Sequence, residues 1–189
     1  VVLKEKRPFS SLGFRGPRPV PKFLLGVLGG FAMFIVPVAL LMLTGQYRLV
    51  DAGTKTSGLA ALLPVVLLFA VWIVQSSTEE TVMRGYLLQI HALQMPAWLA
   101  IIIPAIGFAA IHLNFNPLPL LNITLVAVFF SFVALRQGSL WMVAGLHTGW
   151  NYIQGNILGI PVSGSARQTS LVFLSPTPGS LDWFTGGDF

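Results

Sequence analysis

Three groups of polar residues lie within apolar stretches of the sequence, and their side chains could carry out hydrolysis. The groups contain residue pairs four positions apart: Glu80 and Arg84, Phe108 and His112, and His147 and Asn151. Residues four apart share one face of an α-helix. Because ionisable groups are costly within a membrane helix, their presence there indicates a functional site. We therefore expect three helices to turn these faces toward one cavity.

The first group also contains a second carboxylate, Glu79. An exposed ion pair between Glu80 and Arg84 would contribute only about 0.5 kcal/mol and would leave Glu79 unexplained. Adjacent residues point about 100° apart on a helix. One carboxylate can therefore pair with Arg84 while the other faces a cavity.

The three histidines differ in the polar residues that accompany them. Taken alone, His112 fits a hydrogen-bonded core histidine, and Phe108 fits ordinary packing. His147 and Asn151 on one face require several hydrogen-bond partners, which is costly in lipid unless they meet water or each other. His91 lies close to a loop without such company, and we interpret it as interfacial and not catalytic.

The composition indicates a membrane protein. Of the 189 residues, 54% are apolar and only 9% are charged, against about 25% charged in soluble domains; the mean hydropathy is +0.78. This excludes a water-soluble fold and predicts an all-α, polytopic transmembrane helix bundle, multi-pass in the plasma membrane. The absence of cysteine excludes disulfides, a thiolate nucleophile and an iron–sulfur cluster.

The net charge of +5 is concentrated near the start of the chain. Six of the eleven lysines and arginines precede the first apolar run: Lys4, Lys6, Arg7, Arg15, Arg18 and Lys22. This pattern predicts a cytoplasmic N-terminal segment that contacts membrane lipids, and it does not favour nucleic acid as a partner.

The apolar runs predict the membrane-spanning helices that must position the polar groups. We expect spans at 23–43, 58–74, 95–113 with Pro104 inside, 118–135 and 140–160, and an amphipathic helix after a cap at Ser76 to Thr78. The predicted organisation is a basic segment at 1–22, a transmembrane domain at 23–164 and a loop or truncated tail at 165–189. Within that tail, Trp183 and Phe184 could anchor at the membrane interface.

The polar groups resemble, in order, the three motifs of a known family. Glu79-Glu80-Thr81-Val82-Met83-Arg84, Phe108 to His112 and His147 to Asn151 are similar to the EExxxR, FxxxH and HxxxN motifs of the CAAX prenyl protease 2 and bacteriocin-processing (CPBP, or Abi) intramembrane proteases. The match covers roughly residues 76–164. Val82 and Met83 replace a common aromatic pair, and the further hydrophobic helix usual in bacterial relatives is missing, which leaves open whether the chain is a fragment.

The resemblance implies hydrolysis of a peptide bond, in a peptide or protein substrate, inside or at the edge of the membrane. Without a placed nucleophile, water is the better attacker. Glu80 is our first choice as its base and Glu79 the alternative; the carboxylate not paired with Arg84 is the better base, so both stay open. His112 would orient the water or protonate the leaving amine, and His147 with Asn151 would donate to the oxyanion.

Three alternatives accompany this interpretation. Zinc could be bound by Glu80, His112 and His147, although we favour metal-free chemistry that requires no cofactor. A membrane immunity or scaffold protein with the same fold needs no catalysis. Haem ligation by the two histidines would explain neither the glutamates nor Asn151.

The topology adds one constraint. Five simply alternating spans would separate His112 from the acidic pair by most of the bilayer. We therefore expect the helix that carries Glu79 and Glu80 to enter the membrane itself.

Overall fold

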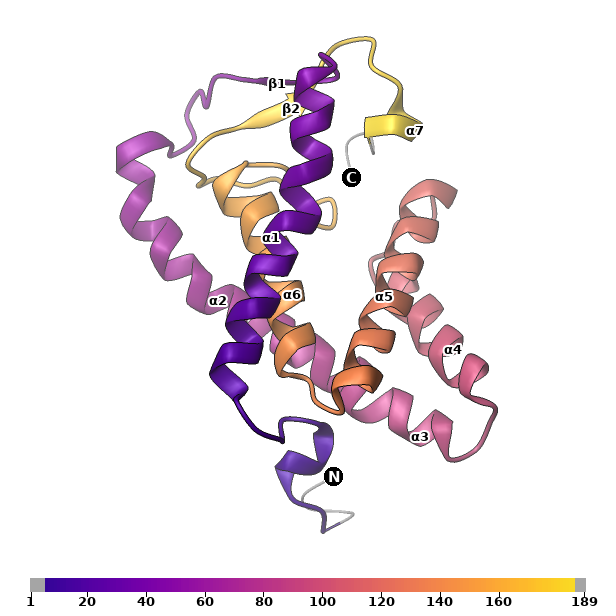
Figure 1. Ribbon diagram of the computed structural model, residues 1–189. Helices are drawn as coiled ribbons and strands as arrows, with labels where there is room; N and C mark the ends of the chain where they lie inside the picture. The colour runs from indigo at the N-terminus through magenta and orange to yellow at the C-terminus, as the bar shows by residue number, and fades with distance from the viewer. Residues whose placement is uncertain (1–5, 186–189) are drawn as a thin grey trace.

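Helices make up almost all of the regular structure in the computed structural model, which describes residues 6–185 (Figure 1). The α-helices are α1 (Pro19–Leu43), α2 (Leu62–Glu80), α3 (Leu88–Ala92), α4 (Ala97–Ala110), α5 (Pro117–Gln137), α6 (Trp141–Tyr152) and α7 (Asp182–Thr185). Two 3₁₀ turns, η1 (Phe9–Leu12) and η2 (Gly58–Ala61), and two π-helical turns, η3 (Thr81–Leu87) and η4 (Ile153–Ile157), adjoin them. The prediction of an all-α bundle is confirmed.

Three helices are long and apolar enough to cross a membrane: Pro19–Leu43, Gly58–Ala92 and Pro117–Gln137. Their outward faces carry exposed aliphatic side chains such as Leu63 and Val66, as expected of surfaces that face lipid. Helix α4 is shorter, and α6 has only 12 residues. The protein is therefore a membrane protein, as predicted, while the number of crossings, the cytoplasmic N-terminus and the plasma membrane stay predictions.

The acidic pair lies inside a continuous helix of 35 residues, Gly58–Ala92. The prediction that Ser76 to Thr78 cap a separate amphipathic helix is wrong. Thr78 Oγ1 donates instead to Val74 O at 2.7 Å, and Thr81 Oγ1 donates to Ser77 O at 2.6 Å. A hydroxyl group that donates to the carbonyl of the preceding turn makes its hydrogen bond within the helix, so the helix continues.

The other helix ends also differ from the prediction. Helix α4 stops at Ala110, and residues 111–113 form a turn in which Leu113 has a φ of 56°. The last predicted span, 140–160, is helical only through Ile157. Both helices therefore end near the residues that the sequence assigns to the site, where the backbone changes direction.

Helices α1 and α6 meet along a seam of glycines. A Cβ atom at Gly26 would lie 2.2 Å from Met142 O, and one at Gly149 would lie 2.3 Å from Val27 O. Only glycine permits such backbone approach, as in other tightly packed membrane helices. Helix α6 also packs against α2, so the glycine seam holds α6 between the first two long helices.

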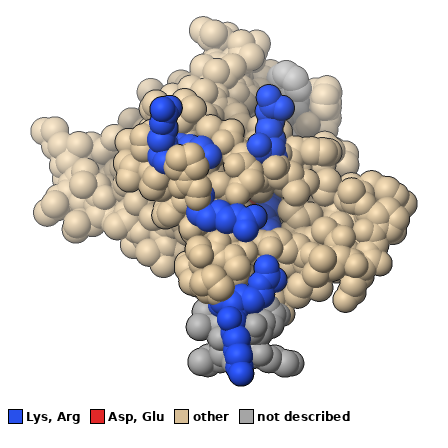
Figure 2. Space-filling model, turned by 60° about the horizontal axis from the view of Figure 1, so that its bottom comes forward, with Lys and Arg blue, Asp and Glu red and all other residues tan. Residues whose placement is uncertain are grey.

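The two ends of the bundle differ in character. One end carries the cations near the N-terminus; Figure 2 shows blue lysine and arginine side chains there, with no red acidic side chain on that face. At this end the N-terminal segment is bonded to the start of α6, because Leu140 N donates to Gly13 O at 2.9 Å. At the other end, strand β1 (Tyr47–Leu49) pairs antiparallel with β2 (Leu174–Pro176) (Figure 1). The chain after α6 therefore returns to the end of the bundle that is opposite the basic N-terminal segment.

Candidate active site

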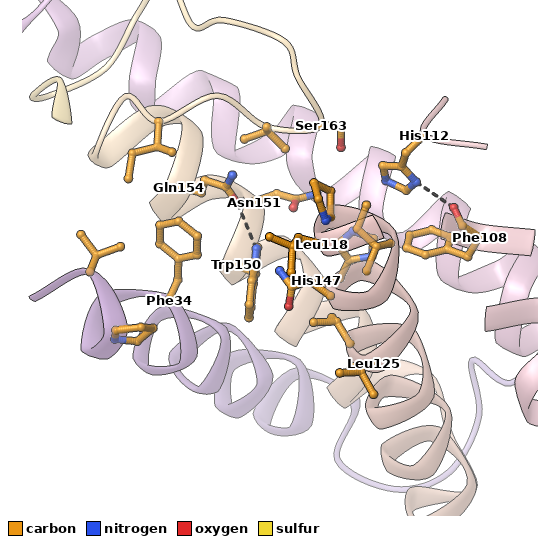
Figure 3. A pocket seen from close by; sticks show the side chains of 18 of the residues that line it. Phe34, Phe108, His112, Leu118, Leu125, His147, Trp150, Asn151, Gln154 and Ser163 are labelled. Carbon is orange, nitrogen blue, oxygen red and sulfur yellow. Dashed lines mark hydrogen bonds between the residues drawn. The ribbon is translucent and has the colours of Figure 1, made fainter. Parts of the chain in front are cut away.

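A cavity of about 920 Å³ lies between the long helices and the loop that follows α6 (Figure 3). Most of its lining is apolar, and α1 and α5 supply more than half of these apolar residues, including Phe34, Leu118 and Leu125. Its polar lining includes Gln75, Glu79, His112, His147, Asn151 and Gln154. A large apolar cavity with a few convergent polar groups is the usual form of a substrate site.

Glu80 is fully buried and lies behind this lining. Its Oε1 accepts a hydrogen bond from Arg84 Nη1 at 2.9 Å and lies 2.8 Å from His147 Nδ1. Its Oε2 is also buried and has no hydrogen-bond partner in the described part of the chain. Glu80 is therefore the internal counter-ion of Arg84, and it also contacts the imidazole of His147.

Arg84 connects this pair to α5. Its Nη2 donates to Ala127 O at 2.7 Å, and its Nε donates to Ser131 Oγ at 3.4 Å. The guanidinium carbon lies 5.3 Å and 5.6 Å from the ring centres of Phe108 and Phe130, within the range of cation–π attraction. Arg84 thus joins α2, α4 and α5 around one buried charge.

Glu79 is the carboxylate that lines the cavity, and 30% of its side chain is exposed. Gln75 Nε2 donates to Glu79 Oε1, and His147 Nε2 lies 3.5 Å from Glu79 Oε2. The Oε1 atom of Gln75 accepts in turn from Asn151 Nδ2 at 3.3 Å. The imidazole of His147 therefore lies between two carboxylates, one buried and one open to the cavity.

His112 lies on the opposite wall of the cavity, in the turn after α4. Its Nδ1 lies 2.7 Å from Phe108 O, and its ring meets the Phe108 ring edge to face at 4.8 Å (Figure 3). It lines the cavity, but among the described residues no hydrogen bond or ion pair joins it to either glutamate. The structure therefore gathers Glu79, Glu80, Arg84, His147 and Asn151 in one network, with His112 facing that network across the cavity.

Local backbone geometry helps to place these residues. The helix widens into the π-helical turn η3 directly after Glu80, and α6 widens into η4 directly after Tyr152. Single π-helical turns inside α-helices occur often at functional sites because they change the direction of the following side chains. Both helices of the network make this change within two residues of a candidate group.

The candidate zinc ligands Glu80, His112 and His147 do not fit a metal in this arrangement. Glu80 Oε1 is already engaged by a guanidinium and an imidazole nitrogen. Among the described residues, no three histidine, aspartate, glutamate or cysteine side chains are grouped closely enough to hold a metal ion. The metal requirement of the protein stays a prediction.

Sequence reasoning missed several residues of the site. Gln75 is one of them, although it lies four positions before Glu79 and Ser76 lies four before Glu80, so helical spacing alone could have found it. Ser131 and Arg167 carry no such signal, because their partners lie far away in the sequence. Only the packed structure assigns them to the arginine network and to the cavity.

The comparison with family models agrees with the resemblance of the three motifs. Residues 61–153 match the model described as type II CAAX prenyl endopeptidase, Rce1-like. No curated protein and no solved structure matches the chain. The matched region begins at η2 and ends just after α6, so it contains all three motifs and every residue of the network. The match assigns residues 61–153, just under half of the chain, to the CAAX protease family, in agreement with the resemblance carried by the three motifs.

Proposed function

We propose that this protein hydrolyses a peptide bond by means of a water molecule that Glu79 activates. The observation that carries the proposal is the difference between the two glutamates. Glu80 is buried and paired with Arg84, whereas Glu79 lines the cavity and contacts His147 Nε2. A carboxylate that already neutralises a guanidinium is the poorer base. The first choice of Glu80 as the base therefore gives way to Glu79.

In the proposed reaction Glu79 removes a proton from water as the water oxygen attacks the peptide carbonyl carbon. The network of two carboxylates, Arg84 and His147 is neutral overall when the imidazole is doubly protonated. In that state Nδ1 donates to Glu80 while Nε2, together with Asn151, donates to the oxyanion. Such donors contribute about 10² to 10³ in rate in other hydrolases.

The intermediate then collapses as the carbon–nitrogen bond breaks. The leaving amine needs a proton, and the proton taken from water returns to it from Glu79 or through His112 on the facing wall. Positioned acids and bases contribute about 10² to 10⁴ in rate. The apolar lining from α1 and α5 suits a substrate segment that is apolar or embedded in the membrane.

The test uses the purified chain in lipid nanodiscs with a library of synthetic peptides, read by mass spectrometry. Glu79→Gln should reduce cleavage by about 10² to 10⁴ without changing the thermal unfolding midpoint. Asp51→Asn is the matched control, because Asp51 is an exposed acid away from the cavity. Wild-type cleavage by Glu79→Gln would refute the base assignment. No cleavage by the wild type of any peptide would favour the non-catalytic immunity or scaffold function.

The same preparation tests the metal requirement. Dialysis against a strong chelator, followed by measurement of bound metal, should leave the cleavage rate unchanged. A rate that falls with metal content and returns on addition of zinc would contradict the metal-free mechanism.

A further inference from the structure

A group of exposed or half-exposed cations lies at the end of the bundle where the chain begins. We call this group the basic surface; its described members are Lys6, Arg7, Arg15, Arg18, Lys22 and Arg136. Figure 2 looks onto this end and shows blue side chains with no red one among the described residues. Within the described part of the chain, no ion pair includes any of the six. The basic surface therefore carries a positive charge that no described carboxylate neutralises, and the proposed hydrolysis does not use it.

The segment that joins the first of these cations to the later ones is packed against the helices. We call residues 8–15 the N-terminal hook. Gln89 Nε2 donates to Ser11 O at 3.1 Å, which bonds the hook to the helix that carries the two glutamates. Leu140 N donates to Gly13 O at 2.9 Å, which bonds the hook to the start of α6. The cations on and beside the hook are therefore held in place by a folded segment.

One member of the basic surface comes from a different element. Arg136 lies in the last turn of α5, two residues before Gly138. The carbonyl oxygen of Gly138 accepts a hydrogen bond from Arg15 Nε at 3.5 Å, although 123 positions separate the two residues. The hook and the end of α5 are therefore neighbours, and cations from distant parts of the sequence form one surface.

The basic surface borders the outward faces of two membrane helices. Arg18 lies directly before α1 and Arg136 in the last turn of α5, and both helices are long and apolar enough to cross a membrane. Val20 and Leu135, beside these cations, are 63% and 54% exposed. A charge at the end of a membrane span lies at the level of the lipid headgroups, with acyl chains beside the apolar residues. A lipid at this place therefore meets positive charge and apolar surface together.

We propose that the basic surface binds the phosphate of an anionic phospholipid through Arg15, Arg18 and Arg136. Guanidinium groups suit this ligand because their planar fork of donors matches the oxygens of a phosphate. A net negative headgroup also gains from the surrounding cations, whereas a zwitterionic headgroup carries its own positive charge. The proposal goes beyond the hydrolysis and does not depend on it. It differs from the attraction of a loose basic tail to a membrane, because a residue of α5 takes part.

The test measures lipid binding, so a chain that proves inactive still decides the proposal. Purified protein in dodecyl maltoside is mixed with phosphatidylglycerol or with phosphatidylcholine of the same acyl chains, and bound lipid is quantified by native mass spectrometry. Phosphatidylglycerol should bind about tenfold more tightly, because several cations near one headgroup each add to the attraction. A higher salt concentration should reduce this preference. Equal affinities for the two lipids would overturn the proposal.

A soluble competitor separates a lipid headgroup from a free phosphate compound. Glycerol phosphate has the same phosphate but no acyl chains, so it should displace phosphatidylglycerol only at a concentration about 10² higher or more. Displacement at an equal concentration would assign the basic surface to a soluble phosphate compound and would overturn the lipid assignment.

Matched variants test whether α5 belongs to the lipid site. Arg136→Gln and Arg18→Gln should each weaken binding of phosphatidylglycerol about fivefold, the expected contribution of one cation near the headgroups. Arg48→Gln removes the same charge from β1, at the opposite end of the bundle, and should bind this lipid as the wild type does. All three side chains are exposed, and the thermal unfolding midpoint checks that each variant is folded. A loss in Arg136→Gln no greater than that in Arg48→Gln would overturn the proposal.

Discussion

The two walls of the cavity are built in different ways. On the wall formed by α2 and α6, Glu79, Glu80 and His147 form a continuous polar network, and glycines pack α6 closely against α1 behind it. On the wall formed by α4 and α5, aliphatic side chains dominate, and among the described residues the hydrogen bond of the His112 side chain is to Phe108 O, a carbonyl of the preceding helix. One wall is organised before substrate binds, and the other offers mainly an apolar surface. Arg84 is the polar connection between them.

The largest expected effect is on stability, when the connection that Arg84 makes between the two walls is removed. Arg84→Ala leaves Glu80 buried without its cation and removes the bond to Ala127 O. Removing one partner of a buried ion pair costs about 3 to 5 kcal/mol. We expect a marked fall in the thermal unfolding midpoint in detergent. An unchanged midpoint would show that the walls are held together without Arg84.

The next effect concerns the organised wall alone. His147→Ala should lower the rate of peptide cleavage by about 10² to 10³, because it removes the proposed oxyanion donor, which lies between the two glutamates. The measurement is the initial rate at saturating peptide. Asn151→Ala should give a smaller loss, since Asn151 bonds to Gln75 and not to a carboxylate. The reverse order would contradict the roles proposed for the two side chains.

A matched pair of histidines tests the facing wall. His112 and His91 make the same local contact, from Nδ1 to the carbonyl oxygen four residues earlier, both at 2.7 Å. Only His112 lines the cavity. His112→Ala should reduce cleavage by about 10², whereas His91→Ala should cleave as the wild type does. Similar losses in both variants would indicate a structural role for this contact.

The smallest expected effect is on stability, and it compares helix packing in the glycine seam with helix packing on α4. Gly149→Ala places a methyl group 2.3 Å from Val27 O, so α1 must move, at a cost of about 1 to 3 kcal/mol. Gly107→Ala on α4 meets no atom within 4 Å and should be neutral or slightly stabilising. Thermal unfolding of the two variants gives the comparison. Equal stability would mean that the glycine seam does not constrain the organised wall.

The sequence could predict the organised wall better than the facing one. Spacing of four residues placed Glu80 beside Arg84, and it left Glu79 on a different face, where the structure has it. The same spacing could not predict that His147 bridges the glutamates, because 67 positions separate His147 from Glu80 and their contact depends on helix packing. The strand pair at 47–49 and 174–176 was also missed. Each strand has three residues, too few for an alternating pattern to be recognised.

The position of α6 sets the order in which the protein can become active during its synthesis. Helix α6 has 12 residues, is made after α1 and α2, and must enter between them for His147 to reach Glu79. On the proposed mechanism, the ribosome therefore releases the earlier helices into the membrane as an inert assembly. On the same mechanism, proteolytic competence arises only when α6 is in place, because α6 carries His147 and Asn151.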